Sequence, residues 1–422
     1  MTSTLEKIDR TLQQFQRFGV HLGLERIERL LAQLGNPQAS VPIVHVAGTN
    51  GKGSVCAYLS SILTEAGYRV GRYTSPHLVD WCERIYLDRA PIAPEDLASC
   101  LENVREATEP SDPSPTQFEV ITAAAWLYFA REQVDVAVIE VGLGGRLDAT
   151  NVVDRPLASI LVSISREHWQ RLGDTLGKIA TEKAGILKPG CPAIIGQLPP
   201  EARAVVETRI EELGCPAWWV EAAQLLPTES ANSLPRASYR GIEYPLPLLG
   251  DVQLLNSALA IETIQVLRER GWAISDAAIE GGMARTQWPG RLQWRQWRDR
   301  PLLLDGAHNV AAAQVLRRYA DTQAQSIVWV MGMLATKDCE GILKTLLRAG
   351  DRLFLVPVRD RTSADPEQLA TLAREICPNL AECRCESTLL EGLEAARASS
   401  DDLMILCGSL YLLGYFFHAE GL

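Results

Sequence analysis

The sequence predicts an α/β protein: a P-loop-type domain with a mainly parallel sheet, followed by a smaller Rossmann-like α/β domain. Apolar runs of strand length alternate with helical segments along most of the 422 residues, an order typical of parallel sheets with helices on both faces. A Gly-rich turn with a lysine joins the first strand to the first helix of this alternation. The alternation begins again near residue 302, after a Pro-Gly sequence.

The elements of the first domain follow from periodicity. Residues 5–34 have the apolar spacing of helices, which Gly35-Asn36-Pro37 ends. The predicted strands then cover 43–47, 69–73, 134–141, 158–164 and 192–196, and the predicted helices cover 54–66, 117–131 and 175–187. Residues 199–250, rich in proline and polar side chains, are expected to form a looser edge of this domain.

The second domain repeats the pattern. Its predicted strands cover 302–304, 326–330, 352–356 and 402–406, and its predicted helices cover 309–320, 338–349, 365–376 and 388–398. Pro289-Gly290 marks a linker within 287–291. We therefore expect a first domain at 1–288 and a second at 289–422, which close on each other when a ligand binds.

Composition excludes several classes of partner. The net charge of -11 argues against general binding to nucleic acids or anionic membranes. The ten cysteines are scattered, and only Cys383 and Cys385 are closely spaced, which fits a reducing cytoplasm better than a zinc site. The first residues are polar, and no apolar run reaches a membrane-spanning length. A cytoplasmic location is expected.

Residues 43–54 have the order of a phosphate-binding loop. An apolar strand leads into glycines, Lys52 and Ser54, and a helical segment follows. Glycines let backbone N–H groups converge on phosphate oxygens, and the helix N-terminus adds partial positive charge. The match to the Walker pattern is imperfect, because Val46 and Gly53 stand where the pattern has Gly and Ser/Thr. The alternative is a Gly-rich turn without a ligand.

A second polar group follows another apolar strand. Glu140 ends the run 136–140, at the place where phosphate-binding α/β domains hold Mg²⁺. The alternative is a strand-end carboxylate that faces solvent. The glycines of 142–145, which permit close approach of a ligand, favour the first interpretation, as do Arg146 and Asp148.

At this point the chain resembles the folylpolyglutamate synthase/dihydrofolate synthase family of the Mur-ligase superfamily. The resemblance covers essentially the whole chain, and 140–151 is its most specific part. The segments that carry it are 23–27, 34–37, 48–54, 74–78, 83–85, 118–119, 140–151, 182–186, 305–309 and 409–411.

The resemblance implies an ATP-dependent amide ligase. ATP phosphorylates a carboxylate of dihydropteroate or a folate, and the amine of L-glutamate displaces phosphate from the acyl phosphate. It also implies two Mg²⁺ ions, which would neutralise the repulsion among three anionic substrates, and a monomer. The sequence does not say whether both dihydrofolate synthesis and polyglutamate extension occur.

Roles carried over by position are part of this resemblance. Ser75, Glu140 and His168 resemble Mg²⁺ ligands, although Glu167 stands where the family has Asp. Lys183 resembles a carbamylated lysine, and Lys52, Lys183, His168 and His308 form the predicted catalytic set. The predicted nucleotide-binding residues are Asn50, Gly51, Lys52, Gly53, Ser54, Asn256, Arg291 and Asp305. The predicted acceptor- and glutamate-binding residues are Ser75, His77, Thr116, Phe118, Glu119, Leu147, Asp148, Ala149 and Ser409.

Three alternatives are weighed. A peptidoglycan-type Mur ligase carries a separate nucleotide-sugar domain, for which the 47 residues before Gly48 are too few. A GTPase-like switch needs a base-specificity motif such as Asn-Lys-x-Asp, which is absent from the sequence. A Mur-type amino-acid ligase acting on a non-folate carboxylate remains as the alternative.

Overall fold

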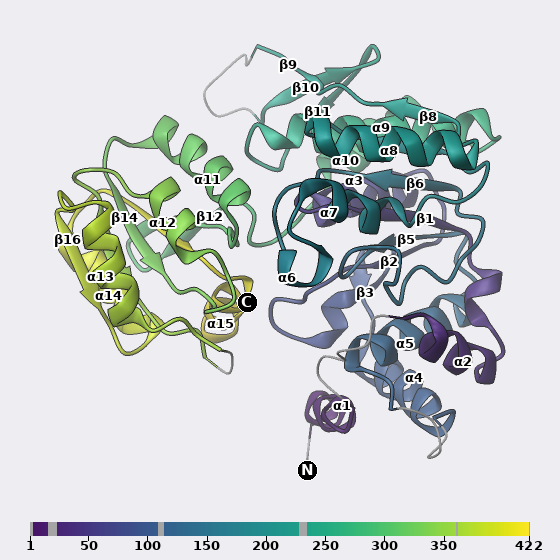
Figure 1. Ribbon diagram of the computed structural model, residues 1–422, viewed down its shortest axis with the longest axis horizontal. Helices are drawn as coiled ribbons and strands as arrows, with labels where there is room; N and C mark the ends of the chain where they lie inside the picture. Colours follow the sequence, from purple (N-terminus) through teal and green to yellow (C-terminus); the bar gives the residue numbers. More distant parts are fainter. Residues whose placement is uncertain (1–2, 16–22, 109–113, 228–233, 360–361, 422) are drawn as a thin grey trace. The chain divides into compact units, whose positions relative to one another are not determined.

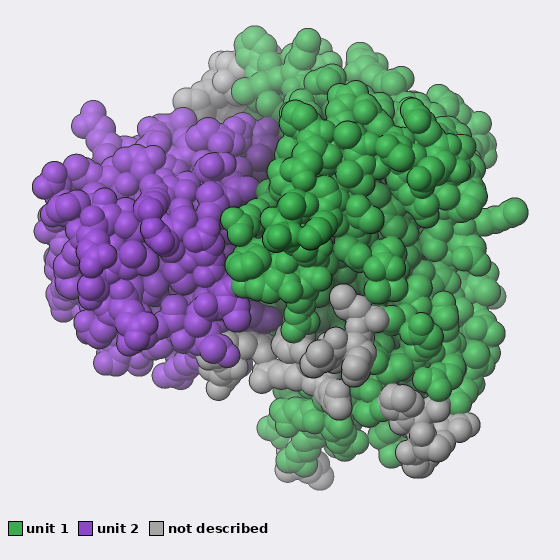
Figure 2. Space-filling view, viewed as in Figure 1, with its two compact units in different colours: residues 1–247, 253–287 green, residues 248–252, 288–422 purple. Residues whose placement is uncertain are grey.

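The computed structural model describes residues 3–15, 23–108, 114–227, 234–359 and 362–421. The chain forms two compact units, coloured separately in Figure 2. The first comprises Met1–Pro247 and Gln253–Gln287, and the second comprises Leu248–Val252 and Trp288–Leu422. The fold-class prediction is confirmed, because each unit is built on a mainly parallel sheet (Figure 1).

The first unit contains an eight-stranded sheet of order β4-β3-β2-β5-β1-β6-β7-β8. Its strands are β1 Ile43–Ala47, β2 Val70–Tyr73, β3 Ile85–Leu87, β4 Ala90–Pro91, β5 Val136–Glu140, β6 Ala158–Leu161, β7 Ala193–Ile195 and β8 Ala217–Trp219. Strands β2, β5, β1, β6, β7 and β8 are parallel. The chain leaves β1 toward β2 and later passes from β5 to β6 on the other side of β1. The carboxyl end of β1 is therefore a switch point, where α/β sheets bind ligands.

Helices cover both faces of this sheet. Helix α3 (Lys52–Glu65) packs on β1, β2 and β5, with α10 (Asp276–Ala284) against it. The opposite face carries α5 (Gln117–Arg131) near one end and α7 (Leu176–Ala184) near the other. The remaining helical segments before residue 200 are α1 Thr4–Gln13, α2 Glu25–Gln33, η1 Pro37–Ser40, η2 Trp81–Arg84, α4 Pro94–Glu106 and α6 Trp169–Leu172. Of the helical region predicted at 5–34, residues 16–22 lie outside the described ranges.

The expectation of a loose edge at 199–250 is wrong. This region contains α8 Pro200–Leu213, the end strand β8, and a three-stranded antiparallel sheet of β9 Gln224–Leu225, β10 Arg236–Tyr239 and β11 Ile242–Pro245. The sheet is tied to α9 (Val252–Glu269), because the hydroxyl of Tyr239 donates to the buried carboxylate of Glu262 at 3.0 Å. Prolines at the ends of these elements raised the proline content without preventing regular structure.

The second unit contains a six-stranded sheet of order β12-β13-β17-β14-β15-β16, parallel except for β12. Its strands are β12 Gln293–Trp297, β13 Arg300–Leu304, β14 Ile327–Met331, β15 Arg352–Leu355, β16 Glu382–Cys385 and β17 Leu403–Cys407. Its helices are α11 Val310–Gln323, α12 Cys339–Leu346, α13 Pro366–Ile376, α14 Leu389–Ser399 and α15 Leu410–Ala419. Among the described residues, we find no helix with both the length and the apolar character needed to span a bilayer.

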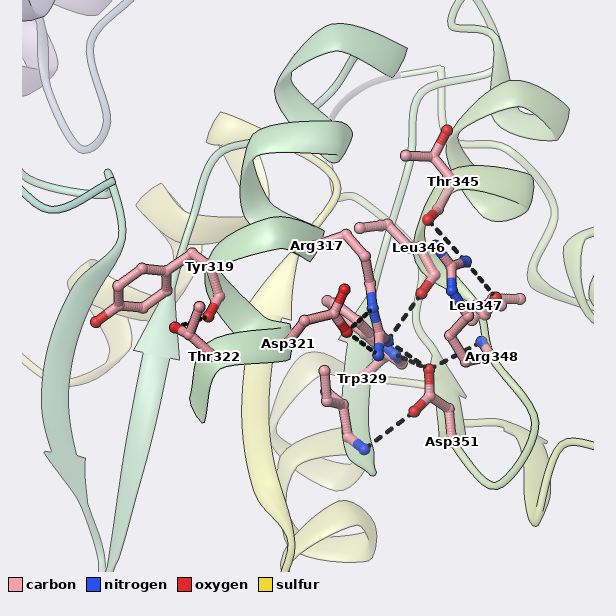
Figure 3. Close-up of polar contacts among 11 residues, drawn as sticks. Arg317, Tyr319, Asp321, Thr322, Trp329, Thr345, Leu346, Leu347, Arg348 and Asp351 are labelled. Carbon is pink, nitrogen blue, oxygen red and sulfur yellow. Dashed lines mark hydrogen bonds and ion pairs between the residues drawn. The ribbon is translucent and has the colours of Figure 1, made fainter. Parts of the chain in front are cut away.

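A buried ion pair joins three elements of the second unit (Figure 3). The carboxylate of Asp351, fully buried, accepts hydrogen bonds from Arg317 of α11 at 2.8 Å and from the Trp329 indole of β14 at 3.0 Å. It also accepts the backbone N–H of Ile327 at 3.1 Å and that of Arg348 at 3.0 Å. One carboxylate thus fixes α11, β14 and the turn before β15.

Candidate functional site

The turn between β1 and α3 has the geometry of a phosphate-binding loop. Gly51 precedes the first helical residue with φ +86°, a left-handed conformation that favours glycine. A Cβ atom at Gly51 would lie only 2.5 Å from Oδ1 of Asn256. The buried Asn256 side chain therefore lies directly against the phosphate loop. Its nucleotide-binding role stays a prediction.

The phosphate loop is braced by the end of β6. The hydroxyl of Ser163 makes two hydrogen bonds to Asn50. It accepts the backbone N–H of Asn50 at 3.1 Å and donates to the Asn50 carbonyl at 2.9 Å. The backbone N–H of Thr49 donates to the carbonyl of Ser163 at 2.8 Å. Ser163 is not among the predicted site residues, although the serines at 163 and 165, which end an apolar run, were a usable signal.

Two lysines converge on the same loop. Lys52 Nζ donates to the carbonyls of Gly48 and Thr49, both at 3.2 Å, and lies 3.8 Å from Oε1 of Glu140. Lys183 Nζ donates to the Gly48 carbonyl at 2.7 Å, and this side chain is buried. Burial, reinforced by the positive charge of Lys52, lowers the pKa of Lys183 from 10.5 to about 7.

Of the three predicted Mg²⁺ ligands, Ser75 and Glu140 lie together. Glu140 ends β5 and Ser75 follows the neighbouring strand β2, so the backbone N–H of Ser75 donates to Oε2 of Glu140 at 3.1 Å. His168 has a largely exposed side chain, with Nε2 3.9 Å from Oε1 of Glu167. Its role as a metal ligand stays a prediction. Over the described ranges, no three His, Cys, Asp or Glu side chains form a metal-binding cluster.

The glycine loop after β5 is held by Asp148. This buried carboxylate accepts the backbone N–H of Leu143 at 2.8 Å, the backbone N–H of Thr150 at 3.0 Å and the Thr150 hydroxyl at 2.6 Å. Burial raises its pKa, which these hydrogen bonds oppose. The loop also docks on α7, since the backbone N–H of Arg146 donates to the Glu182 carbonyl at 2.7 Å. Helix α7 therefore contacts the glycine loop and also carries the buried Lys183.

The start of α5 lies beside this loop. A Cβ atom at Gly142 would lie 2.4 Å from Cζ of Phe118, so the aromatic ring packs on the loop backbone. Thr116 caps α5 by accepting the backbone N–H of Glu119, and the Glu119 carboxylate accepts that of Thr116. Arg26 pairs with Glu119 at 3.1 Å. Thr116 and Glu119 thus have structural contacts, and their predicted substrate contacts stay predictions.

The other predicted acceptor-site residues have distinct surroundings. His77 Nδ1 accepts from Nε of Arg84 at 2.9 Å, and its ring packs edge-on against Trp81. Leu147 is half-buried, whereas Ala149 is buried in the apolar core between the sheet and α5.

In the second unit, predicted residues gather at the carboxyl ends of β13 and β17. Asp305 follows β13, and its buried carboxylate accepts the backbone N–H groups of Leu292 and Ala307, both at 2.9 Å. Burial raises its pKa, and the nearby positive charge of Arg291 opposes this shift. A Cβ atom at Gly306 would lie 3.2 Å from the Arg291 guanidinium.

His308 and Ser409 complete this group. His308 Nδ1 lies 2.8 Å from the Gly306 carbonyl. Ser409 follows β17 and is the buried N-cap of α15, where its hydroxyl accepts the backbone N–H of Tyr411 at 3.2 Å. The arrangement brings the residues predicted in this unit, Arg291, Asp305, His308 and Ser409, to neighbouring strand ends.

Comparison with known proteins identifies the family. A model of the Mur ligase middle domain matches residues 46–264, and a model of the dihydrofolate synthetase C-terminal domain matches residues 291–419. A probable dihydrofolate synthetase of Schizosaccharomyces pombe is 35% identical over 94% of this chain and 97% of its own length. The chain belongs to the folylpolyglutamate synthase/dihydrofolate synthase family.

Further members of the folylpolyglutamate synthase/dihydrofolate synthase family agree over nearly the whole chain. The folylpolyglutamate synthase of Lacticaseibacillus casei is 36% identical over 92% of both chains. The solved structure of Mycobacterium tuberculosis folylpolyglutamate synthase complexed with ADP superposes with a TM-score of 0.88 at 30% identity, covering 99% of this chain and 98% of that chain. The resemblance predicted from the motifs is confirmed.

Proposed function

We propose that this chain is an ATP-dependent ligase that adds L-glutamate to dihydropteroate, to tetrahydrofolate and its polyglutamates, or to both. The observation that carries the proposal is the convergence of Lys52, Glu140 and the buried Lys183 on one glycine-rich loop at the switch point of the first sheet. Family relatives carry both names, dihydrofolate synthetase and folylpolyglutamate synthase, at 35% and 36% identity. The choice of acceptor is therefore left to assay.

The reaction has two steps. A carboxylate oxygen of the acceptor attacks the γ-phosphorus of ATP, the bond to the β-phosphate oxygen breaks, and ADP leaves. The glutamate nitrogen then attacks the acyl carbon, the C–O bond to phosphate breaks, and the amine gives up a proton. Charge spreads over phosphoryl oxygens in the first step, so fixed cations and backbone N–H groups stabilise it.

In the first step, the phosphate loop and Lys52 hold the triphosphate. Lys52 is restrained by two backbone carbonyls, so its ammonium is in place before the nucleotide arrives. The N-terminus of the 14-residue helix α3 points its free N–H groups at the same place. Asn256, whose side chain lies against Gly51, would contact the nucleotide.

The donor set suits Mg²⁺. Glu140 supplies a carboxylate and Ser75 a hydroxyl at adjoining strand ends, and the 3.1 Å hydrogen bond from the Ser75 backbone N–H to the Glu140 carboxylate keeps the two residues together. Mg²⁺ is commonly bound by one or two carboxylates together with substrate phosphates and water. Ser75 and Glu140 would hold the first ion, with His168 as a ligand of the second. When bound, Mg²⁺ would supply charge neutralisation between the nucleotide and the anionic acceptor.

Lys183 suits carbamylation. Its pKa of about 7 leaves a large share of free amine near neutral pH, and the free amine is the form that bonds to CO₂. Nζ of the free amine would bond to the carbon of CO₂ and lose one proton, which replaces a neutral amine by an anion beside Lys52. NMR with isotopically labelled CO₂ should show a carbamate signal that Lys183→Arg abolishes. A signal unchanged by that substitution would assign the carbamate to another lysine.

The second unit supplies Arg291, Asp305 and His308 for the nucleotide and Ser409 for glutamate. These assignments rest on the grouping of the four residues at the ends of β13 and β17. We propose domains at 1–288 and 289–422 and a cytoplasmic monomer, as the sequence predicts.

The test is product analysis with purified protein. With Mg²⁺, ADP and phosphate should form only when ATP, a pteroate-type acid and L-glutamate are all present. Mass spectrometry should show that the acceptor gains one glutamyl residue per ATP. L-aspartate should be a poor substitute, because its shorter side chain cannot reach the same contacts from the amine position. Hydrolysis of ATP without a glutamylated product, for both dihydropteroate and tetrahydrofolate, would exclude this substrate class.

A further inference from the structure

Strand β1 carries one polar side chain in an otherwise apolar run. His45 is 1% exposed and lies between Val44 and Val46 at the centre of the sheet. The register pairs it with Ile139 of β5 and Ser159 of β6, so it lies on the sheet face that α5 and α7 cover. A buried imidazole in this position lowers stability unless it has a hydrogen-bond partner.

The partner of His45 is the loop that Asp148 organises. His45 Nε2 lies 2.9 Å from Oγ1 of Thr150, a residue that is fully buried. The single hydroxyl proton of Thr150 is donated to Asp148, with an O···O distance of 2.6 Å. The His45 contact therefore requires a proton on Nε2, donated to the threonine oxygen. Burial lowers the His45 pKa to about 3, so the ring is neutral and has one N–H to give.

The chain of contacts continues through Asp148 into the glycine loop. Oδ1 of Asp148 accepts from Thr150, and Oδ2 accepts the backbone N–H of Leu143 at 2.8 Å. Both ends of the segment 143–150 are thus linked to one strand of the sheet through His45. The same strand enters the phosphate loop three residues after His45, at Gly48. A shift of the glycine loop relative to the phosphate loop would break the His45–Thr150 hydrogen bond.

We propose that His45 is a positioning residue, which sets the acceptor-binding loop 142–150 relative to the phosphate loop through Thr150 and Asp148. The inference rests on the proposed function, in which the pteroate-type acid contacts Leu147 and Asp148 as the sequence predicts. Because the His45 side chain is buried, it is a positioning residue rather than a group that contacts the substrate. Its contribution is to hold the acceptor carboxylate in line with the nucleotide, so loss of the contact should weaken acceptor use more than nucleotide binding.

The experiment compares matched substitutions at both ends of the contact. Thr150→Val removes the hydroxyl at nearly constant shape, whereas Thr150→Ser keeps it. His45→Leu removes the donor, whereas His45→Gln returns an N–H near the position of Nε2. Thr263→Val is the control, because Thr263 of α9 is equally buried and donates its hydroxyl only to the Leu259 carbonyl of its own helix at 2.8 Å. For each variant, KM is measured separately for the acceptor and ATP, together with kcat and the dissociation constant of ADP.

We expect Thr150→Val and His45→Leu to raise KM for the acceptor about tenfold, equivalent to about 1.4 kcal/mol. KM for ATP and the affinity for ADP should stay within twofold of wild type. Thr150→Ser and His45→Gln should recover most of the loss, and Thr263→Val should behave as wild type. If Thr150→Val does not fold and therefore does not bind ADP, the comparison of His45→Leu with His45→Gln tests the inference, because both variants leave the Thr150–Asp148 contact in place.

Two results would overturn the inference. Equal rises of KM for ATP and the acceptor would indicate general loosening of the unit, and an unchanged acceptor KM would show that the contact positions nothing. Failure of the proposed function looks different, because the wild-type protein would then give no glutamylated product with either acceptor.

Discussion

Lys52 offers the sharpest test at the scale of single residues. We expect Lys52→Ala to lower kcat/KM by on the order of 100-fold, or about 3 kcal/mol, as is usual when one fixed transition-state contact is lost. ADP release is the measurement. Lys178→Ala is the matched control, because Lys178 is exposed and pairs at 2.8 Å with Asp174, which lies just before α7. Near-normal turnover in Lys52→Ala would contradict the phosphate-loop assignment.

Lys183 should give the protein a characteristic dependence on pH. Its pKa falls from 10.5 to about 7 on folding, chiefly through burial. Between these pH values the unfolded chain binds a proton that the folded protein does not, so the free energy of unfolding rises as pH increases through this window. Lys183→Met should flatten that rise. Urea unfolding at pH 7 and pH 9, in CO₂-depleted buffer without nucleotide, measures it, with Lys178→Met as control. An identical rise in the free energy of unfolding from pH 7 to pH 9 in wild type and Lys183→Met would refute the prediction.

Single residues were also where the sequence was most and least informative. Lys52 and Glu140, whose side chains lie 3.8 Å apart, were predicted as site residues because strand, glycines and charge occur in a recognisable order along the chain. Ser163 and the His45–Thr150 contact were not found, because they join residues more than 100 positions apart. Such pairings depend on strand order, which local patterns do not contain. Thr116 was predicted to bind the substrate. However, a Thr three residues before Glu119 is itself a capping signal, and Thr116 caps α5 in the structure.

At the scale of elements, the buried carboxylate of Asp351 should dominate the stability of the second unit. Asp351→Ala removes the buried carboxylate from the Arg317 guanidinium and leaves only the half-exposed Asp321 as its partner, and breaking a buried pair typically costs about 3–5 kcal/mol. Asp321→Ala is the control, because Asp321 pairs with the same arginine but is half exposed, so its loss should cost about 1 kcal/mol or less. Chemical denaturation followed by Trp fluorescence reports on both. Equal effects would mean that burial does not decide the strength of this network.

Element prediction succeeded for several central elements of the first unit and missed others. The strand at 43–47 and the helix at 117–131 agree with β1 and α5 at both ends. Helix α9 was missed, although its apolar residues surround the axis in the same way as those of α5, which was predicted. The strand β12 was missed as well. As the antiparallel edge of its sheet it carries polar residues that resemble a loop.

For the whole molecule, nucleotide binding should appear as added stability. A ligand that binds only the folded protein, present at 100 times its dissociation constant, adds about 2.7 kcal/mol to the free energy of unfolding. We expect ADP to shift the urea midpoint of wild type accordingly and to shift that of Lys52→Ala much less at the same concentration. Arg203→Ala, a substitution on the exposed face of α8, should respond as wild type. An equal shift of the urea midpoint in Lys52→Ala would mean that ADP does not bind at the phosphate loop.

The interleaving of the two units has a consequence for synthesis of the chain. Residues 248–252 belong to the second unit, where Asp251 pairs with Arg318 at 2.9 Å and Leu249 joins the apolar core. The ribosome makes these five residues before the first unit is complete and well before α11 exists. A nascent chain that stalls near residue 287 would therefore have a finished first unit together with an apolar segment that lacks its partner.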